Sequence, residues 1–131
     1  MNHIEAKVIK IERKDNITLV SFASQGQNLR MMSLGLNTPI KEGSQVTLGV
    51  KATSIALAKN LSGEISMSNQ LPCKIEALNK GELLCSITLR FGDALIESIT
   101  TLKSANTMNL ELEDEVIALI KASELSILEV R

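Results

Sequence analysis

Two three-residue segments carry side chains suited to binding an anion. They are Lys51-Ala52-Thr53 and Lys121-Ala122-Ser123, and each follows an alternating apolar run. A lysine ammonium, a hydroxyl and the backbone N–H groups freed at a strand corner are all hydrogen-bond donors, and a tetrahedral dianion needs many donors and few acceptors. The same residues are also ordinary at an exposed strand end, because a three-residue pattern is a weak signal by itself. The recurrence of the pattern at the same place in two halves of the chain makes an anion site as reasonable an interpretation as two exposed strand ends.

The residue types that catalysis requires do not form a recognisable set. The single histidine, His3, lies beside the N-terminus, so the chain has no Cys/His or Ser/His/Asp arrangement. The glycines are too dispersed for a phosphate-binding loop. We therefore expect a binding protein and not an enzyme, with no metal site and no covalent cofactor.

The composition limits the classes of partner. The chain has 131 residues, of which 44% are hydrophobic, but it contains only two Phe and no Trp or Tyr, so its core must be aliphatic. A barrel of ~60 residues with such a core is marginal as a monomer, and we expect the chain to associate with itself as a dimer or trimer. The 14 basic and 15 acidic residues are spread along the chain and leave a net charge of −1. Without a basic block or aromatic platforms, direct nucleic-acid binding is disfavoured.

The termini and cysteines indicate the compartment. The N-terminal segment is charged and alternating, which is not the pattern of a signal peptide. No apolar run approaches the ~20 residues of a transmembrane helix. Cys73 and Cys85 lie in apolar, strand-like segments without CxxC spacing, so we expect two buried, reduced thiols. A cytoplasmic protein without a membrane partner is expected.

An internal repeat divides the chain into two halves. Apolar residues recur at matching positions, although few residues are identical. We expect two units, residues 1–61 and residues 65–131, joined by the polar, glycine-containing segment 60–64. The segments that align without a gap are 4–22 with 71–89 and 50–57 with 120–127.

Each unit is predicted to consist mainly of short strands. Turn residues at 14–16 and 79–81 predict hairpins between alternating runs. The segments 30–36 and 98–105 lack alternation, and their spacing predicts one or two helical turns. The predicted fold class is all-β, with tandem OB-like five-stranded β-barrels that each contain one short helix. Predicted strands include 5–12, 16–23, 45–51, 54–58, 115–121 and 124–130.

Three segments of the second unit occur together in an informative order. They are Ser66-Met67-Ser68-Asn69-Gln70-Leu71, Thr101-Leu102-Lys103-Ser104-Ala105 and Lys121-Ala122-Ser123. They resemble the Ser-Ala-Arg-Asn-Gln-Leu, Thr-x-x-Ser-Ala and Lys-Ala-Ser elements of the Mop domain, in the molbindin (Mop/TOBE) family. The resemblance covers almost all of the second unit.

In that family these segments, contributed by neighbouring units, surround molybdate or tungstate at interfaces. The resemblance therefore implies a molybdate or tungstate ligand, with the oxyanion held at seams between modules or subunits. The binding residues that it implies are Lys51, Ala52, Thr53, Ser66, Ser68, Asn69, Thr101, Ser104, Ala105, Lys121, Ala122 and Ser123.

The sequence departs from the family pattern in ways that reduce the expected number of sites. Ser68 stands where the family often has an anion-facing arginine, so one positive charge is missing there. The first unit lacks the opening Ser-Ala-Arg element, and Met31 and Leu34 stand where Thr and Ser would align. Ser33 and Arg30 are available as shifted substitutes, and Arg30 would restore the missing charge, although its alternative role is that of an ordinary surface residue.

Two functional classes remain open from the sequence. A protein of this family stores or buffers molybdate inside the cell, or serves as the sensor domain of a molybdate-responsive regulator or a transporter ATPase. The alternative is an OB-like protein-interaction module without a small-molecule ligand. Bound oxyanion at integral stoichiometry distinguishes the first class from the second.

Overall fold

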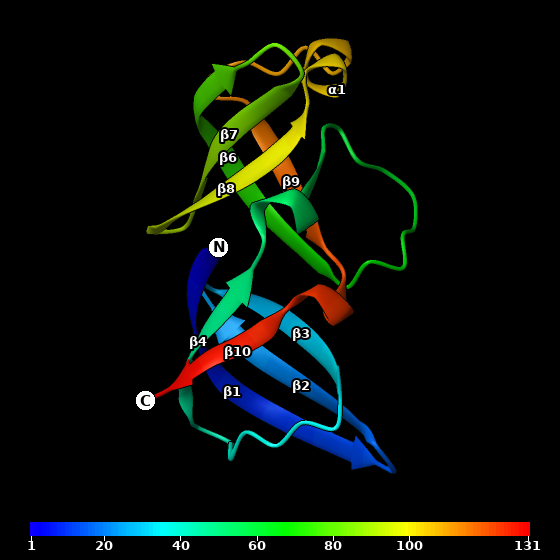
Figure 1. Cartoon of the computed structure of the whole chain (residues 1–131), viewed down its shortest axis with the longest axis vertical. Helices are drawn as coiled ribbons and strands as arrows, with labels where there is room; N and C mark the ends of the chain where they lie inside the picture. The colour runs from blue at the N-terminus through cyan, green and yellow to red at the C-terminus, as the bar shows by residue number, and fades with distance from the viewer.

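The computed structural model describes all 131 residues as two curled five-stranded antiparallel sheets stacked end to end (Figure 1). The sheet of the first barrel has the strand order β10-β4-β1-β2-β3, and that of the second has the order β5-β9-β6-β7-β8. The predicted all-β class with tandem five-stranded barrels is thereby confirmed, and the one α-helix belongs to the second barrel. The strands are β1 (Asn2–Lys14), β2 (Ile17–Ser24), β3 (Gln27–Leu34), β4 (Gln45–Val50), β5 (Ala56–Ala58), β6 (Asn69–Lys80), β7 (Leu84–Phe91), β8 (Ala94–Thr101), β9 (Glu115–Ile120) and β10 (Ser126–Val130). The helical elements are the 3₁₀ turns η1 (Ala52–Ser54) and η2 (Ala122–Glu124) and the helix α1 (Leu102–Thr107).

The strands follow the alternation of apolar residues in the sequence. In β2 every second residue is buried, and the residues between them face outward. The turn between β1 and β2 contains Asp15, whose φ is 53°, a left-handed conformation that Asp and Asn tolerate. The predicted hairpins at 14–16 and 79–81 are both present.

The two barrels exchange their last strands. β5 follows β4 in the sequence but pairs with β9 of the second sheet, with Ala56 opposite Leu119. β10 pairs with β4 of the first sheet, with Ser126 opposite Gly49. The division into units 1–61 and 65–131 thus remains a proposal about the sequence repeat, since at one edge each sheet takes a strand from the other unit.

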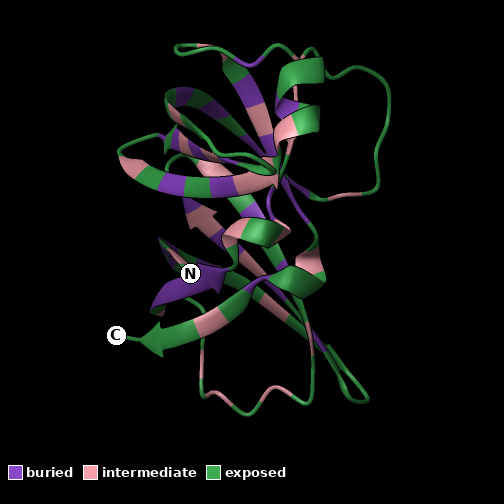
Figure 2. Ribbon diagram, turned by 45° about the horizontal axis from the view of Figure 1, so that its top comes forward, coloured by how far each residue is buried: buried purple, intermediate pink, exposed green.

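A single, mainly aliphatic core runs through both barrels and includes Phe22 and Phe91. It contains 25 buried residues from the two halves, so the junction between the barrels is packed interior. The buried positions alternate with exposed ones along the strands in Figure 2. Cys73 and Cys85 are both buried and free, which confirms the prediction of two reduced, buried thiols.

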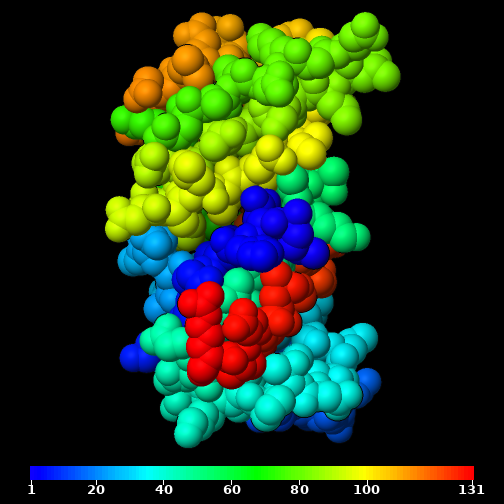
Figure 3. All heavy atoms as spheres, turned by 60° about the vertical axis from the view of Figure 1, so that its left-hand side comes forward, coloured from blue at the N-terminus to red at the C-terminus, as the bar shows by residue number.

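The N-terminus lies at the junction of the barrels, with Asn2 opposite Val50, whereas β10 starts there and runs along β4 away from it, to Val130 opposite Val46. β1 and β10 are the two neighbours of β4. Figure 3 shows the N-terminal residues and the last strand on one face, between the two halves of the molecule. No helix in the structure combines the length and the hydropathy that crossing a membrane would require.

Two predicted helical segments need correction. The prediction of helical turns at 30–36 is wrong, because residues 27–34 form β3. There Leu29 and Met31 are buried while Arg30 and Met32 are exposed, which is the period of a strand, and β2 supplies the pairing partner. In the segment 98–105, residues through Thr101 belong to β8 and only the remainder is helical.

Candidate functional site

Two of the predicted binding segments meet at one end of the second sheet. Asn69, the first residue of β6, lies opposite Ile120, the last residue of β9. The residues before β6 and those after β9 therefore leave the sheet side by side. They enclose a cavity of about 200 Å³, lined by Met32, Ser66, Met67, Ser68, Lys121, Ala122 and Ser123.

A second cavity, of about 190 Å³, continues this space along the edge strand β3. The two cavities share Met32, Ser68 and Ala122, and the second adds Arg30. We call the space around Ser66–Ser68, Lys121–Ser123, Arg30 and Met32 the Lys121 hollow. Arg30 is exposed, and its side chain makes no ion pair within the chain.

The Lys121 hollow is rich in hydrogen-bond donors. Ser66, Ser68 and Ser123 contribute hydroxyls, and Lys121 contributes an ammonium. Lys121 is the extended residue that precedes η2, and no side chain caps that turn. The first N–H groups of such a turn have no partner within it, so they add donors at the same place.

The carboxylates nearest to the hollow have other partners. Glu124 in η2 accepts a hydrogen bond from Ser54 Oγ of η1 at 3.1 Å. Glu12, which lines the second cavity together with Arg30, lies 3.7 Å from the ammonium of Lys10. Among the seven residues that line the first cavity there is no acidic side chain. An anion in that cavity therefore meets donors and one lysine, with no carboxylate in the lining.

Asn69 holds the two sides of the hollow together. It is fully buried, and its side chain accepts a hydrogen bond from Arg30 N at 2.7 Å and donates one to Arg30 O at 2.9 Å. These bonds join the start of β6 to the edge strand β3 of the other barrel. The predicted binding residue Asn69 thus places Arg30 beside Ser68.

The segment Lys51-Ala52-Thr53 lies at the corresponding corner of the other barrel. Here η1 packs on β8, as η2 packs on β3. Asn2 repeats the role of Asn69: its side chain donates to Glu97 O and accepts from Glu97 N, both at 2.8 Å. None of the five cavities in the structure is lined by any residue of 51–53.

The residues Thr101, Ser104 and Ala105 lie in a third place. Thr101 caps helix α1, and its Oγ1 accepts a hydrogen bond from Ser104 N at 3.1 Å. Ala105 is buried in the core. Figure 1 shows α1 at the far end of the second barrel, away from η2. Within one chain these three residues are therefore not brought to the Lys121 hollow.

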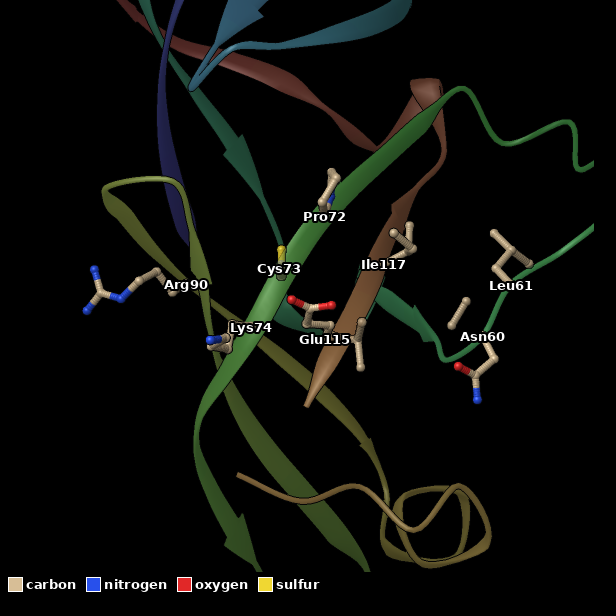
Figure 4. A pocket seen from close by; sticks show the side chains of 10 residues that line it. Asn60, Leu61, Pro72, Cys73, Lys74, Arg90, Glu115 and Ile117 are labelled. Carbon is tan, nitrogen blue, oxygen red and sulfur yellow. The ribbon is translucent and has the colours of Figure 1, made fainter. Parts of the chain in front are cut away.

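A further cavity, of about 510 Å³, lies between the connecting segment and strands β6 and β9 (Figure 4). Its lining includes the carboxylate of Glu115, which disfavours a dianion. Both of its cations are already paired, Lys74 with Glu113 at 3.7 Å and Arg90 with Glu76. Burial raises the pKa of the Cys73 thiol in this lining to about 11, and a thiol with that pKa stays protonated near neutral pH. The structure contains no group of three or more His, Cys, Asp or Glu residues able to hold a metal ion.

The predicted segments Ser66–Ser68 and Lys121–Ser123 account for most of the hollow but not for its β3 side. The sequence suggests Arg30 only as a substitute charge and gives Met32 no role in the site. The alternation of buried Leu29 and Met31 with exposed Arg30 and Met32 was the available signal, because it identifies a strand with an outward-facing arginine.

Comparison with known proteins shows similarity to one domain family. The sequence profile of the TOBE domain matches residues 65–127. The molybdenum import ATP-binding proteins ModC of Brucella abortus and Brucella suis are each 28% identical to the chain over 98 residues, which is 74% of this chain and 26% of theirs. The chain therefore spans about a quarter of the length of these curated relatives.

One solved structure is similar over nearly the whole chain. It is the cytoplasmic molybdate-binding protein ModG, crystallised with molybdate bound. The TM-score is 0.89 at 22% sequence identity, and the match covers 96% of this chain and 94% of that one. At this identity the likeness shows a shared fold.

Proposed function

We propose that the chain, whose residues 65–127 match the TOBE domain, binds molybdate or tungstate in the Lys121 hollow. The observation that carries this proposal is the meeting of Ser66–Ser68 with Lys121–Ser123 around one cavity whose lining has hydroxyls, a lysine and no carboxylate. Arg30 supplies a second positive charge from the neighbouring barrel. It takes the place of the arginine that the family often has at Ser68.

The donor set favours a fully deprotonated tetrahedral dianion. The proton of monohydrogen phosphate would face another donor, which costs ~1–3 kcal/mol when the pair is buried. Sulfate has no such proton but is smaller, so fixed donors around a larger ion would contact it poorly. Molybdate and tungstate are nearly equal in size, and we expect the hollow to bind both.

A second copy of the chain is proposed to complete the site. Thr101 and Ser104 lie far from the hollow within one chain, and the Mop family assembles its sites from neighbouring units. We propose that they reach the hollow of another copy in a dimer or trimer. An ion held by two subunits stabilises the assembled state, so occupancy and assembly would be linked.

The proposed biological role is intracellular storage and homeostasis of the oxyanion, or sensing for a molybdate-responsive regulator. Cytoplasmic location and the absence of membrane and direct nucleic-acid partners are part of this proposal. Binding without catalysis is also proposed, since no serine hydroxyl of the hollow is hydrogen-bonded to Lys121 as a Ser–Lys nucleophile would be.

Native mass spectrometry of the full chain with and without tungstate tests the function. We expect tungstate at integral stoichiometry per chain or per oligomer. No bound ion at millimolar tungstate would overturn the proposal and would favour an OB-like protein-interaction module.

A further inference from the structure

Two similar sites lie at the junction of the barrels. We call them the Lys121 corner, which contains Lys121–Ser123, Asn69 and Arg30, and the Lys51 corner, which contains Lys51–Thr53, Asn2 and Glu97. In each, a 3₁₀ turn that follows a strand packs on the edge strand of the other barrel, η1 on β8 and η2 on β3. In each, an asparagine at the start of a strand bonds both main-chain groups of one residue on that edge strand. Asn69 bonds Arg30 in this way, and Asn2 bonds Glu97.

These hydrogen bonds define which residues are equivalent. The interval in sequence from Asn2 to Asn69 is the same as that from Arg30 to Glu97. Lys51 and Lys121 occupy the same position, each the extended residue directly before its turn. The two corners therefore share a lysine and the same pair of asparagine–backbone hydrogen bonds. They differ in the charge on the edge strand, which is positive at Arg30 and negative at Glu97.

The side chain of Glu97 adds acceptors where Arg30 adds donors. Its carboxylate accepts a hydrogen bond from Ser86 Oγ of β7 at 2.8 Å, and no lysine or arginine pairs with it. Arg30 lines the second cavity of the Lys121 hollow together with Ser68 and Ala122, and the carboxylate in that lining, Glu12, is paired with Lys10. A dianion is attracted by Arg30 at the Lys121 corner and repelled by Glu97 at the Lys51 corner, and these two residues occupy equivalent positions.

The cavities also distinguish the two corners. The Lys121 corner has two adjoining cavities, whereas no cavity is lined by Lys51, Ala52 or Thr53. The charge of Arg30 and the presence of cavities therefore both favour anion binding at the Lys121 corner.

We infer that the chain is a one-sided binder: the Lys121 corner takes the tetrahedral oxyanion, and the Lys51 corner excludes it because Glu97 stands where Arg30 stands in its counterpart. This inference rests on the proposed function, and it sets the stoichiometry at one corner ion per chain. The Lys51 corner then serves as a packing contact between the barrels, closed by the bond from Ser98 Oγ to Ile55 O at 2.6 Å.

A matched pair of charge exchanges tests the inference. Tungstate per chain is measured by equilibrium dialysis with elemental analysis for the full-length wild type, Arg30→Glu and Glu97→Arg. Both side chains are exposed, so neither exchange disturbs the core, and thermal unfolding of each variant checks this. We expect one corner ion in the wild type, affinity at least ~10-fold weaker in Arg30→Glu, and a second bound ion in Glu97→Arg.

Crystals grown with tungstate locate the ions by anomalous scattering. Density beside Lys121 alone in the wild type, and beside both lysines in Glu97→Arg, supports the inference. Equal occupancy of both corners in the wild type, or a Glu97→Arg variant that still binds one ion, overturns it while leaving the proposed function intact. A wild type that binds no tungstate overturns the proposed function itself.

Discussion

The buried amide of Asn69 clamps the main chain of Arg30 from the opposite barrel, with hydrogen bonds of 2.7 Å and 2.9 Å. This contact links a strand start in one half of the chain to an edge strand in the other. It also sets the distance between Arg30 and the loop that carries Ser68. The stability of the barrel junction and the geometry of the proposed site therefore depend on the same side chain.

Replacing Asn69 by Ala should destabilise the protein by about 2 kcal/mol, because it removes two hydrogen bonds and leaves Arg30 N–H and C=O without partners. Urea unfolding followed by circular dichroism measures this free energy. Asn2→Ala is the matched control, and we expect a smaller loss there because Asn2 is only half-buried. A larger loss for Asn2→Ala than for Asn69→Ala would contradict this ranking.

Replacing Lys121 by Ala should weaken tungstate binding by about 1.5–3 kcal/mol, or roughly tenfold to a hundredfold in Kd, since a charge-assisted hydrogen bond is lost. Isothermal titration calorimetry measures the affinity. Lys7→Ala removes an exposed lysine of β1 that makes no ion pair, and it should leave the affinity unchanged. Unchanged affinity in Lys121→Ala would remove this residue from the site.

The strand exchange predicts that each half of the chain stabilises the other barrel. Ile127 in β10 and Leu57 in β5 are equivalent, half-buried residues that pack against the core. Ile127→Ala should lower the hydrogen-exchange protection of β4, and Leu57→Ala should lower that of β9. We expect a cost of about 1–3 kcal/mol for each. If Ile127→Ala instead loosened β9 first, the observed pairing of β10 would be wrong.

The buried thiol of Cys73 predicts a loss of stability at high pH. Its pKa rises from the usual 9.0 to about 11 in the folded protein because burial disfavours the thiolate. Below pH 9 the thiol is protonated in both states. Between pH 9 and about 11 the unfolded chain ionises first, so folding becomes less favourable as the pH rises.

Comparison with Cys73→Ala isolates this contribution from the titration of lysines. The free energy of unfolding is measured by urea denaturation at pH 8 and pH 10.5 for both proteins. The wild type should lose more stability over this interval than the variant. Equal losses would show that Cys73 ionises as readily in the folded protein as in the unfolded chain.

Most strands were predictable because their signals are local. Alternating side chains and turn residues such as Asp15 act over a few positions, and these determine the hairpins β1–β2 and β6–β7. β3 was missed because two adjacent methionines obscured its alternation. Only pairing with β2 along its full length shows that Arg30 faces outward.

The sequence by itself determined the aliphatic strands, the repeat and the two lysine corners, because each depends on neighbouring residues. Only the tertiary structure decided that β5 and β10 pair across the junction, that Arg30 faces Ser68, and that Thr101 lies apart from Lys121. The physical reason lies in the short η1 and η2 turns. The turn η1 leads the chain from β4 to β5 in the second sheet, and η2 leads it from β9 to β10 in the first sheet. The backbone of β4 or β9 can pair with either β5 or β10, so packing at the junction selects the pairing. The pairing in turn places Arg30 at the Lys121 corner and Glu97 at the Lys51 corner.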